Sequence, residues 1–396
     1  MELSSWSPTC DGRAALLLAC LSACAPGGER PDARADVAEW RVASEPLLTV
    51  GAVDGPSETL LSRVADARLL PDGGVAVADG GSSSIRIFDA DGRLRTTRGR
   101  AGEGPGEFAS LSALHLYSPD TLVAWDSRLS RLTLFPPDPG APVVTTPVHA
   151  PGGSAELWLG RFGDGSGAVG WIRQGPRGPD AVSADRMDLG RVAIGLGQIS
   201  VLAPTQGIRR VAFQRPGGAR TSMPLPFSPH LVGAVSGDAL YFTDGVGPAL
   251  EVVGSDGGRR GPLVHGLTGP PVAEALARLA AELPETGDRG ALTTDDLDAV
   301  AAVTPLDPIP AVSALFSDDQ GRLWLKAYDP VADSHWLGRS LAGGTWWIAR
   351  RTGGMLARVQ VPDGFRPMDV RGSRVAGLVR DTLGVERVEV RALLAP

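Results

Sequence analysis

The strongest constraint on the fold comes from residues 75–97, where apolar and polar residues alternate on both sides of a turn. Alternation runs through 75–79, breaks at a cluster of Gly and Ser, and resumes through 85–88. A second turn at Asp91-Gly92 leads into a further strand. Period-two alternation marks β-strands, and X-Gly turns between them mark hairpins. The stretch therefore predicts an antiparallel sheet of three or four short strands.

The same unit recurs along the chain. Its anchor is an Asp that ends the second strand, followed six or seven residues later by an apolar residue of the third strand. The copies are at Asp79, Asp126 and Asp244, with looser ones at Asp329 and Asp381. Sheet-forming repeats of roughly 40–50 residues are typical of propeller blades rather than of helical solenoids. We therefore expect an all-β, six-bladed β-propeller over residues 37–396.

The sequence also predicts how the ring closes. The expected blades run to residue 99 and then cover 114–146, about 157–213, 231–264, 312–361 and 368–394. The last blade lacks one strand, and residues 39–50 supply spare strand material ahead of the first. Because closure removes open sheet edges, we expect this N-terminal segment to complete the last blade.

One helical segment, residues 271–303, interrupts the strand pattern between blades four and five. Leu276, Leu279 and Leu283 share one helix face. A second short helix is expected to open at Thr294 with a Thr N-cap.

The N-terminus has the layout of an export signal. Residues 1–23 carry Arg13 and then an apolar run of signal-peptide length. The run ends in Leu-Ser-Ala-Cys24, which resembles the bacterial lipoprotein lipobox, where the Cys is lipidated and becomes the mature N-terminus. Cleavage before Cys20 and a chance Cys after an ordinary signal peptide are the alternatives. Residues 24–36 are polar and fit a tether.

This resemblance implies an exported protein that is lipid-anchored in the cell envelope and contacts the membrane through its N-terminal anchor. Ala25 after the Cys favours the outer membrane, facing the periplasm or the cell surface. The three Cys residues all lie at or before Cys24, so the body can form no internal disulfide. A net charge of −7 argues against a nucleic-acid partner, which would need a concentrated basic face.

Residues 75–92 and the following run Gly102–Phe108 resemble the six-bladed propeller proteins related to NHL repeats, in particular envelope-associated bacterial members. The resemblance implies the fold over nearly the whole mature chain. Function must still be argued from a site, because propellers host many unrelated activities.

Candidate binding residues follow from the expected topology. Turns between second and third strands lie on the same face as the crossovers to the next blade, so the turn residues and the crossover residues meet there. The turn residues are Asp79, Asp126 and Asp244, and the crossover residues are Arg100, Glu103 and Glu107. Residues 175–185 and the helical segment extend the same face, which we expect to be the working one. The alternative is that each Asp only caps its own turn.

Catalytic signals are sparse. The five His residues show no metal-ligand spacing, and there is no Gly-x-Ser-x-Gly elbow. Some propeller hydrolases and lactonases hold a divalent cation with Glu, Asp and Asn, but this chain contains no Asn. No cofactor is predicted, although carboxylates alone could bind a divalent cation.

These observations favour a non-enzymatic binding or scaffolding module in the envelope, with an unidentified envelope protein, peptide or glycan as its partner. The first alternative is a metal-assisted hydrolase or lactonase with carboxylates at the channel mouth. A further alternative is carbohydrate or peptide recognition through Trp125 and Trp171.

Overall fold

The computed structural model describes residues 37–173, 182–215, 218, 220–285, 291–337 and 344–396. The expected signal peptide, the lipidation of Cys24 and the tether lie outside the described residues, as does most of the 175–185 segment. Within the described part of the chain, no helix is both long and apolar enough to cross a membrane.

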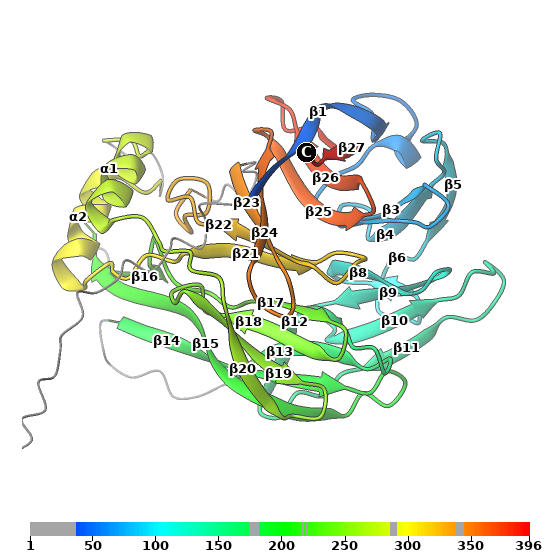
Figure 1. Ribbon diagram of the computed structural model, residues 1–396, viewed down its shortest axis with the longest axis horizontal. Helices are drawn as coiled ribbons and strands as arrows, with labels where there is room; N and C mark the ends of the chain where they lie inside the picture. Colours follow the sequence, from blue (N-terminus) through cyan, green and yellow to red (C-terminus); the bar gives the residue numbers. More distant parts are fainter. Residues whose placement is uncertain (1–36, 174–181, 216–217, 219, 286–290, 338–343) are drawn as a thin grey trace, which may run out of the picture.

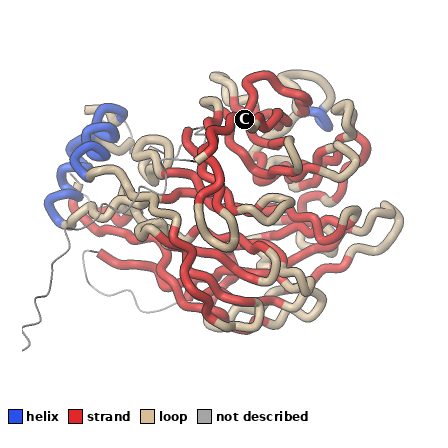
Figure 2. Tube along the Cα trace, viewed as in Figure 1, coloured by secondary structure: helices blue, strands red, loops and turns tan. Residues whose placement is uncertain are grey.

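The fold is built mainly from antiparallel sheets that follow one another along the chain (Figures 1 and 2). The first sheet holds β2 (Val64–Leu69), β3 (Val75–Asp79), β4 (Ser84–Phe88) and β5 (Leu94–Arg98). A short ribbon of β6 (Arg100–Ala101) and β7 (Glu107–Phe108) leads to the second, which holds β8 (Leu111–Ser118), β9 (Thr121–Asp126), β10 (Arg131–Phe135) and β11 (Val144–Pro147). A 3-10 turn, η1 (Ser57–Thr59), precedes β2.

The third sheet has five strands, namely β12 (Gly153–Arg161), β13 (Gly167–Arg173), β14 (Val182–Val192), β15 (Ile199–Gln214) and β16 (Arg220–Pro224). The fourth holds β17 (Val232–Ser236), β18 (Ala239–Thr243), β19 (Ala249–Gly254) and β20 (Arg259–Val264). The third sheet extends beyond the expected 157–213 because β15 is long enough to pair with β14 on one side and with β16 on the other.

The last sheet has eight strands and divides at β1 (Ala38–Val50). One half holds β21 (Val312–Ser317), β22 (Leu323–Ala327), β23 (Gly344–Ala349) and β24 (Met355–Val361). The other holds β25 (Phe365–Arg371), β26 (Arg374–Arg380) and β27 (Glu386–Leu394). Most of β1 pairs antiparallel with β27, which confirms the expected closure by the N-terminal strand. The start of β1 also pairs in parallel with β24, and this pairing was not predicted.

The sheets surround a common centre, and the first strand of each lies innermost (Figure 1). Contacts run from β2 to β8, β8 to β12, β12 to β17 and β17 to β21, and β25 contacts β2. A buried apolar cluster separates each sheet from the next, including the two halves of the eight-stranded sheet. Packing of this kind is propeller-like, since each sheet buries both faces against its neighbours.

Two helices stand at one side of the ring, between β20 and β21 (Figure 1). They are α1 (Val272–Glu282) and α2 (Thr294–Val303). Leu279 and Leu283 are buried against Val211 and Phe213 of β15, as the shared helix face predicts. The expected Thr294 cap is wrong by one residue, because Thr293 forms the capping box with Asp296.

Candidate functional site

The innermost strands leave a hollow at the centre of the ring. Its mouth, about 260 Å³ in volume, lies where the first strands end and turn back into the second strands. Residues from all of the innermost strands line it, among them Arg68, His115, Arg161, Ser236, Ser317, Asp369 and Arg371. The mouth therefore lies at the opposite strand ends from Asp79, Asp126 and Asp244.

An inner section of about 140 Å³ adjoins the mouth, and Arg68, His115, Val235 and Ser317 line both. Its wall combines the polar side chains of Asp66, Arg68 and His115 with the half-buried rings of Trp158 and Phe316. Gly160 lets β12 approach β17 here, since its φ is +133° and an added Cβ would lie 3.0 Å from the Val235 Cβ. The central channel, as we call the mouth and inner section together, thus joins a charged mouth to an aromatic interior.

Arg68 ties three innermost strands together at the channel wall. Its Nε donates to the Leu114 carbonyl on β8 at 2.7 Å, and its Nη1 donates to the Met368 carbonyl on β25 at 3.3 Å. Its Nη2 donates to Asp66 Oδ2 at 2.7 Å, and Nη1 lies 3.5 Å from Asp369 Oδ1. Two channel carboxylates therefore share one guanidinium.

Burial shifts the pKa of two groups in this wall. Burial, followed by the charges of Arg68 and Arg161, lowers the pKa of His115 to about 3, so the imidazole is neutral at pH 7. Burial raises the pKa of Asp369, and the Arg68 charge only partly opposes that rise. Shifted groups in a concave site point to ligand binding or chemistry.

Two further guanidiniums flank the mouth. Arg161 Nε donates to the Tyr117 carbonyl at 3.1 Å, and its guanidinium carbon lies 4.9 Å from the centre of the Tyr117 ring. Arg371 Nε donates to the Leu69 carbonyl at 3.2 Å. Among the described residues, neither side chain pairs with a carboxylate. Both cations are thus held in place by backbone carbonyls rather than by an ion pair, although the charge of Arg371 acts on nearby Asp369.

Two of the sequence-predicted site residues are buried turn caps. Asp126 accepts hydrogen bonds from the N–H groups of Ala109, Ser110, Arg128 and Leu129. Asp79 forms an ion pair with Arg86 at 2.8 Å and accepts bonds from Ser62, Gly81 and Ser82. These contacts are the local capping that the alternative interpretation anticipated, and a binding role for either residue stays a prediction.

The remaining predicted residues lie on turns and on the β6–β7 crossover. Asp244 accepts a bond from the Val246 N–H at 3.1 Å. Glu107 pairs with Arg100 at 2.7 Å, and the Gly104 N–H and then Arg100 hold the pKa of Glu107 below its usual value. Glu103 is exposed, and its carbonyl accepts a bond from Arg131. The crossover brings Arg100 and Glu107 together, while Asp79, Asp126 and Asp244 belong to separate sheets.

The alternative of carbohydrate or peptide recognition through aromatic residues is wrong for Trp125 and Trp171. Trp125 and Trp171 are 1% and 0% exposed and belong to the core between the second and third sheets. In the part of the chain that the structure describes, no three His, Cys, Asp or Glu side chains cluster as a metal site.

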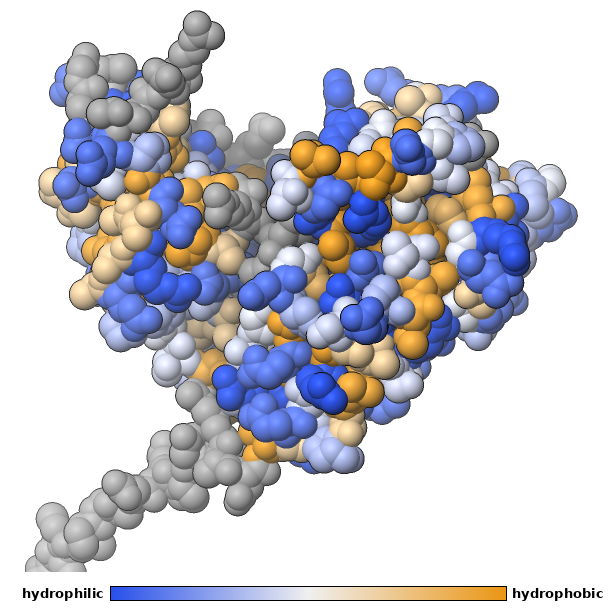
Figure 3. Space-filling model, turned by 90° about the horizontal axis from the view of Figure 1, so that it is seen from above, coloured by the Kyte–Doolittle hydropathy of each residue, from blue (hydrophilic) through white to orange (hydrophobic). Residues whose placement is uncertain are grey.

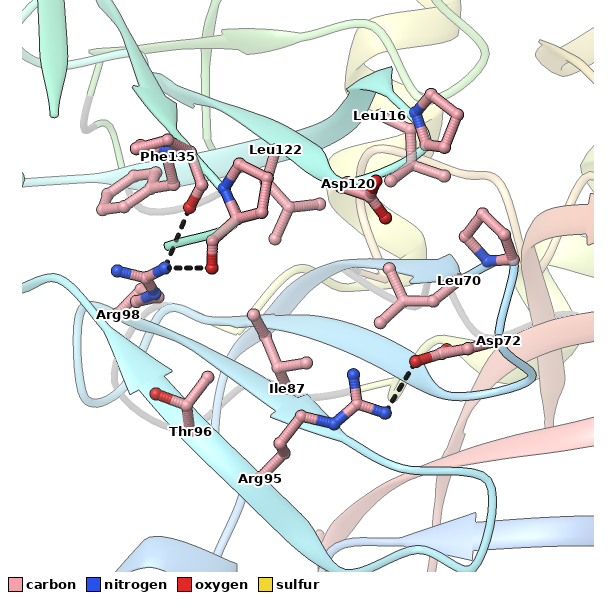
Figure 4. Close-up of a pocket in the computed structure, with 14 residues that line it drawn as sticks. Leu70, Asp72, Ile87, Arg95, Thr96, Arg98, Leu116, Asp120, Leu122 and Phe135 are labelled. Carbon is pink, nitrogen blue, oxygen red and sulfur yellow. Dashed lines mark hydrogen bonds and ion pairs between the residues drawn. The ribbon is translucent and has the colours of Figure 1, made fainter. Parts of the chain in front are cut away.

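A second hollow, about 240 Å³ in volume, lies between the first two sheets (Figure 4). Leu70, Ile87, Leu122 and Phe135 form its apolar wall. At its rim Arg95 pairs with Asp72, and Arg98 donates to the carbonyls of Pro136 and Pro137. Arg95 is therefore already ion-paired, whereas Arg98 is held by backbone carbonyls alone, as Arg161 and Arg371 are.

Comparisons with known proteins show a similarity of fold. No family model matches the chain, and no curated protein matches it significantly. A member of the DUF4221 family from Bacteroides vulgatus superposes with a TM-score of 0.53 at 9% identity, covering 91% of this chain and 99% of that one. The likeness is one of fold.

Two other solved structures align less well. A calcium-binding protein, regucalcin, from Agrobacterium tumefaciens has a TM-score of 0.43 at 16% identity, covering 91% of this chain and 98% of that one. Virginiamycin B lyase from Staphylococcus aureus has a TM-score of 0.39 at 11% identity, covering 87% and 86%. Likenesses this remote do not extend to activity.

Proposed function

We propose that the protein is a non-enzymatic binding module whose ligand enters the central channel. In this proposal the body is a six-bladed propeller, with the two halves of the eight-stranded sheet as separate blades. A lipid on Cys24 anchors it in the cell envelope, by the lipobox resemblance. The observation that carries the proposal is the convergence of fixed charged side chains and an aromatic interior in one hollow built by all the innermost strands.

The state of the channel carboxylates favours binding over metal-assisted hydrolysis. Asp66 and Asp369 both contact Arg68, and Asp318 Oδ2 accepts from Arg322 Nε at 2.6 Å. Asp319 Oδ1 accepts the Gly372 N–H at 3.1 Å. A divalent cation needs several carboxylate or carbonyl oxygens, and these oxygens already have donors. Clustered carboxylates without compensation would have favoured the hydrolase.

A blocked channel tests the proposal. Ala113 lies on the wall of the inner section and is only partly buried, although it also packs against the core between the second and third sheets, so Ala113→Phe should narrow the channel. The probes are benzoate, benzamide and benzylamine, which share an aromatic ring and differ in charge. We expect calorimetric binding of at least one probe to the wild type and its loss in the variant, with the melting temperature of the free protein preserved. Equal binding of every active probe to both proteins would overturn the proposal.

A further inference from the structure

We infer that the central channel takes a small aromatic carboxylate, with the ring in the inner section and the carboxylate between Arg161 and Arg371 at the mouth. This inference rests on the proposed function and adds the chemical class of the ligand. It is carried by two independent observations, one at each end of the channel.

The first observation concerns the two guanidiniums, Arg161 and Arg371, that form no ion pair among the described residues. Arg161 belongs to β12 and Arg371 to β25, which stand three strands apart in the order in which the innermost strands contact one another. They therefore face the mouth from opposite sides. Arg161 is oriented by the Tyr117 ring and carbonyl, and Arg371 by the Leu69 carbonyl. A guanidinium fixed in this way loses little freedom when it binds a planar anion, which its forked N–H groups match in shape.

The carboxylates around these two residues are held by other partners and form no ion pair with them in the described part of the chain, although the charge of Arg371 acts on Asp369. The four carboxylates that line the mouth or the inner section are Asp66, Asp318, Asp319 and Asp369, and each accepts a hydrogen bond or ion pair from the protein. His115 is neutral, so it adds no charge of either sign. A ligand carboxylate would supply the ion-pair partner that Arg161 and Arg371 lack among the described residues.

The second observation is the shape and lining of the inner section. Trp158 and Phe316 present rings there beside the apolar side chains of Leu159, Ala234 and Val235. The polar side chains of Asp66, Arg68, His115 and Ser317 also line the section. Its volume of about 140 Å³ is close to that of a dry protein cavity that admits benzene, roughly 150 Å³. Aromatic rings favour tilted or offset contacts with other rings. A single aromatic ring therefore fits this section in size and in chemistry.

A larger hollow of about 790 Å³ is lined by Arg278, Lys326 and Tyr328, but its two cations are already ion-paired, with Asp329 and Asp333. On the face seen in Figure 3, hydrophobic residues occur in small groups separated by hydrophilic ones. The hollow between the first two sheets has an apolar wall, but one of its two rim cations, Arg95, is already paired with Asp72.

The test compares three ring-matched probes with four proteins. Benzoate, benzamide and benzylamine are titrated by calorimetry into the wild type, Arg161→Gln, Arg371→Gln and Arg93→Gln. Arg93 is the matched control, because its side chain is 76% exposed and pairs with Asp91 away from the channel. We expect benzoate to bind the wild type and the control most tightly of the three. Each channel substitution should weaken benzoate about tenfold or more and leave benzamide unchanged, since only the charged ligand loses a charge-assisted bond.

The outcomes separate this inference from the proposed function. Benzamide or benzylamine binding as tightly as benzoate, or benzoate binding unaffected by both channel substitutions, would overturn the carboxylate class. If probe binding fails the carboxylate criterion in one of these ways but is still lost in Ala113→Phe, the channel remains a binding site and only the proposed ligand class is wrong. Binding that survives Ala113→Phe would overturn both.

Discussion

Arg68 on β2 lies 3.5 Å from Asp369 on β25, so residues 301 positions apart in sequence meet at the channel wall. The same guanidinium holds Asp66 and the carbonyl of Leu114 on β8. Since β25 lies near the end of the chain and β2 near its start, this contact joins the two ends of the ring. Arg68 thus links closure of the fold to the shape of the candidate site.

Replacing Arg68 with Met should destabilise the protein by about 2–4 kcal/mol. Loss of one partner of a buried ion pair leaves the other charge without compensation, and here two carboxylates would be left. The midpoint of urea unfolding measures the effect. Arg93→Met, which breaks an exposed pair, should change stability by roughly 0.5 kcal/mol or less. Equal effects of the two substitutions would contradict the role of Arg68.

His115 should make the protein less stable as the pH falls. Its pKa is about 3 in the folded state and 6.5 ordinarily, so below pH 6.5 the unfolded chain takes up a proton that the folded protein does not. Its contribution is therefore largest above pH 6.5 and declines toward pH 3, by at most about 1.4 kcal/mol per pH unit. His115→Gln should remove this part of the slope in unfolding experiments between pH 7 and pH 4. A slope identical in the two proteins would show that the imidazole titrates normally.

Asp126→Asn should lower the free energy of unfolding although the side chain keeps its size. Oδ1 accepts two backbone N–H groups and Oδ2 accepts two more, so an amide NH₂ in either place would face donors. We expect a loss of about 2–4 kcal/mol, measured by urea unfolding. Asp120→Asn in the exposed β8–β9 turn is the control and should be nearly neutral. If Asp126→Asn left stability unchanged but abolished ligand binding, the sequence-based binding prediction would regain its place.

Removal of β1 should open the ring. This strand pairs with both β27 and β24, and Val42 and Val50 are 4% and 2% exposed. Deleting residues 1–50 would uncover the edges of β24 and β27, and exposed strand edges pair with other chains. Size-exclusion chromatography with light scattering should show aggregation of this variant. Deleting only residues 1–36 should leave the oligomeric state the same as that of the full chain. Matching behaviour of the two truncations would mean that β1 is dispensable.

Much of the fold could be predicted from local sequence patterns. Period-two alternation located the strands, Asp79 and Asp126 end β3 and β9 as expected, and the missing strand of the last sheet is supplied by β1. These features depend on contacts within one sheet or on the need to cover its edges. The parallel pairing of β1 with β24 could not be foreseen, because it depends on how two neighbouring sheets are placed.

The candidate site was harder to predict for a related reason. The residues predicted from the sequence lie in turns after second strands and in the β6–β7 crossover, where charged side chains are conspicuous. The central channel lies instead at the ends of the first strands. The sequence does contain one signal for the channel: Asp66 and Arg68 alternate with apolar residues along one strand, so both point to the same face. The partnership with Asp369 and the approach of Arg161 and Arg371 arise only when the ring closes.

The most direct test of a ligand in the central channel is the indole N–H resonance of Trp158, assigned from its absence in Trp158→Phe. The ring lies beside His115 in the inner section, with ring centres 6.5 Å apart. Benzoate titration followed by transverse-relaxation-optimised NMR should shift this resonance in a saturable manner and leave the buried indoles of Trp125 and Trp324 in place. Saturable benzoate binding that leaves Trp158 unmoved would place the ligand elsewhere and contradict the account.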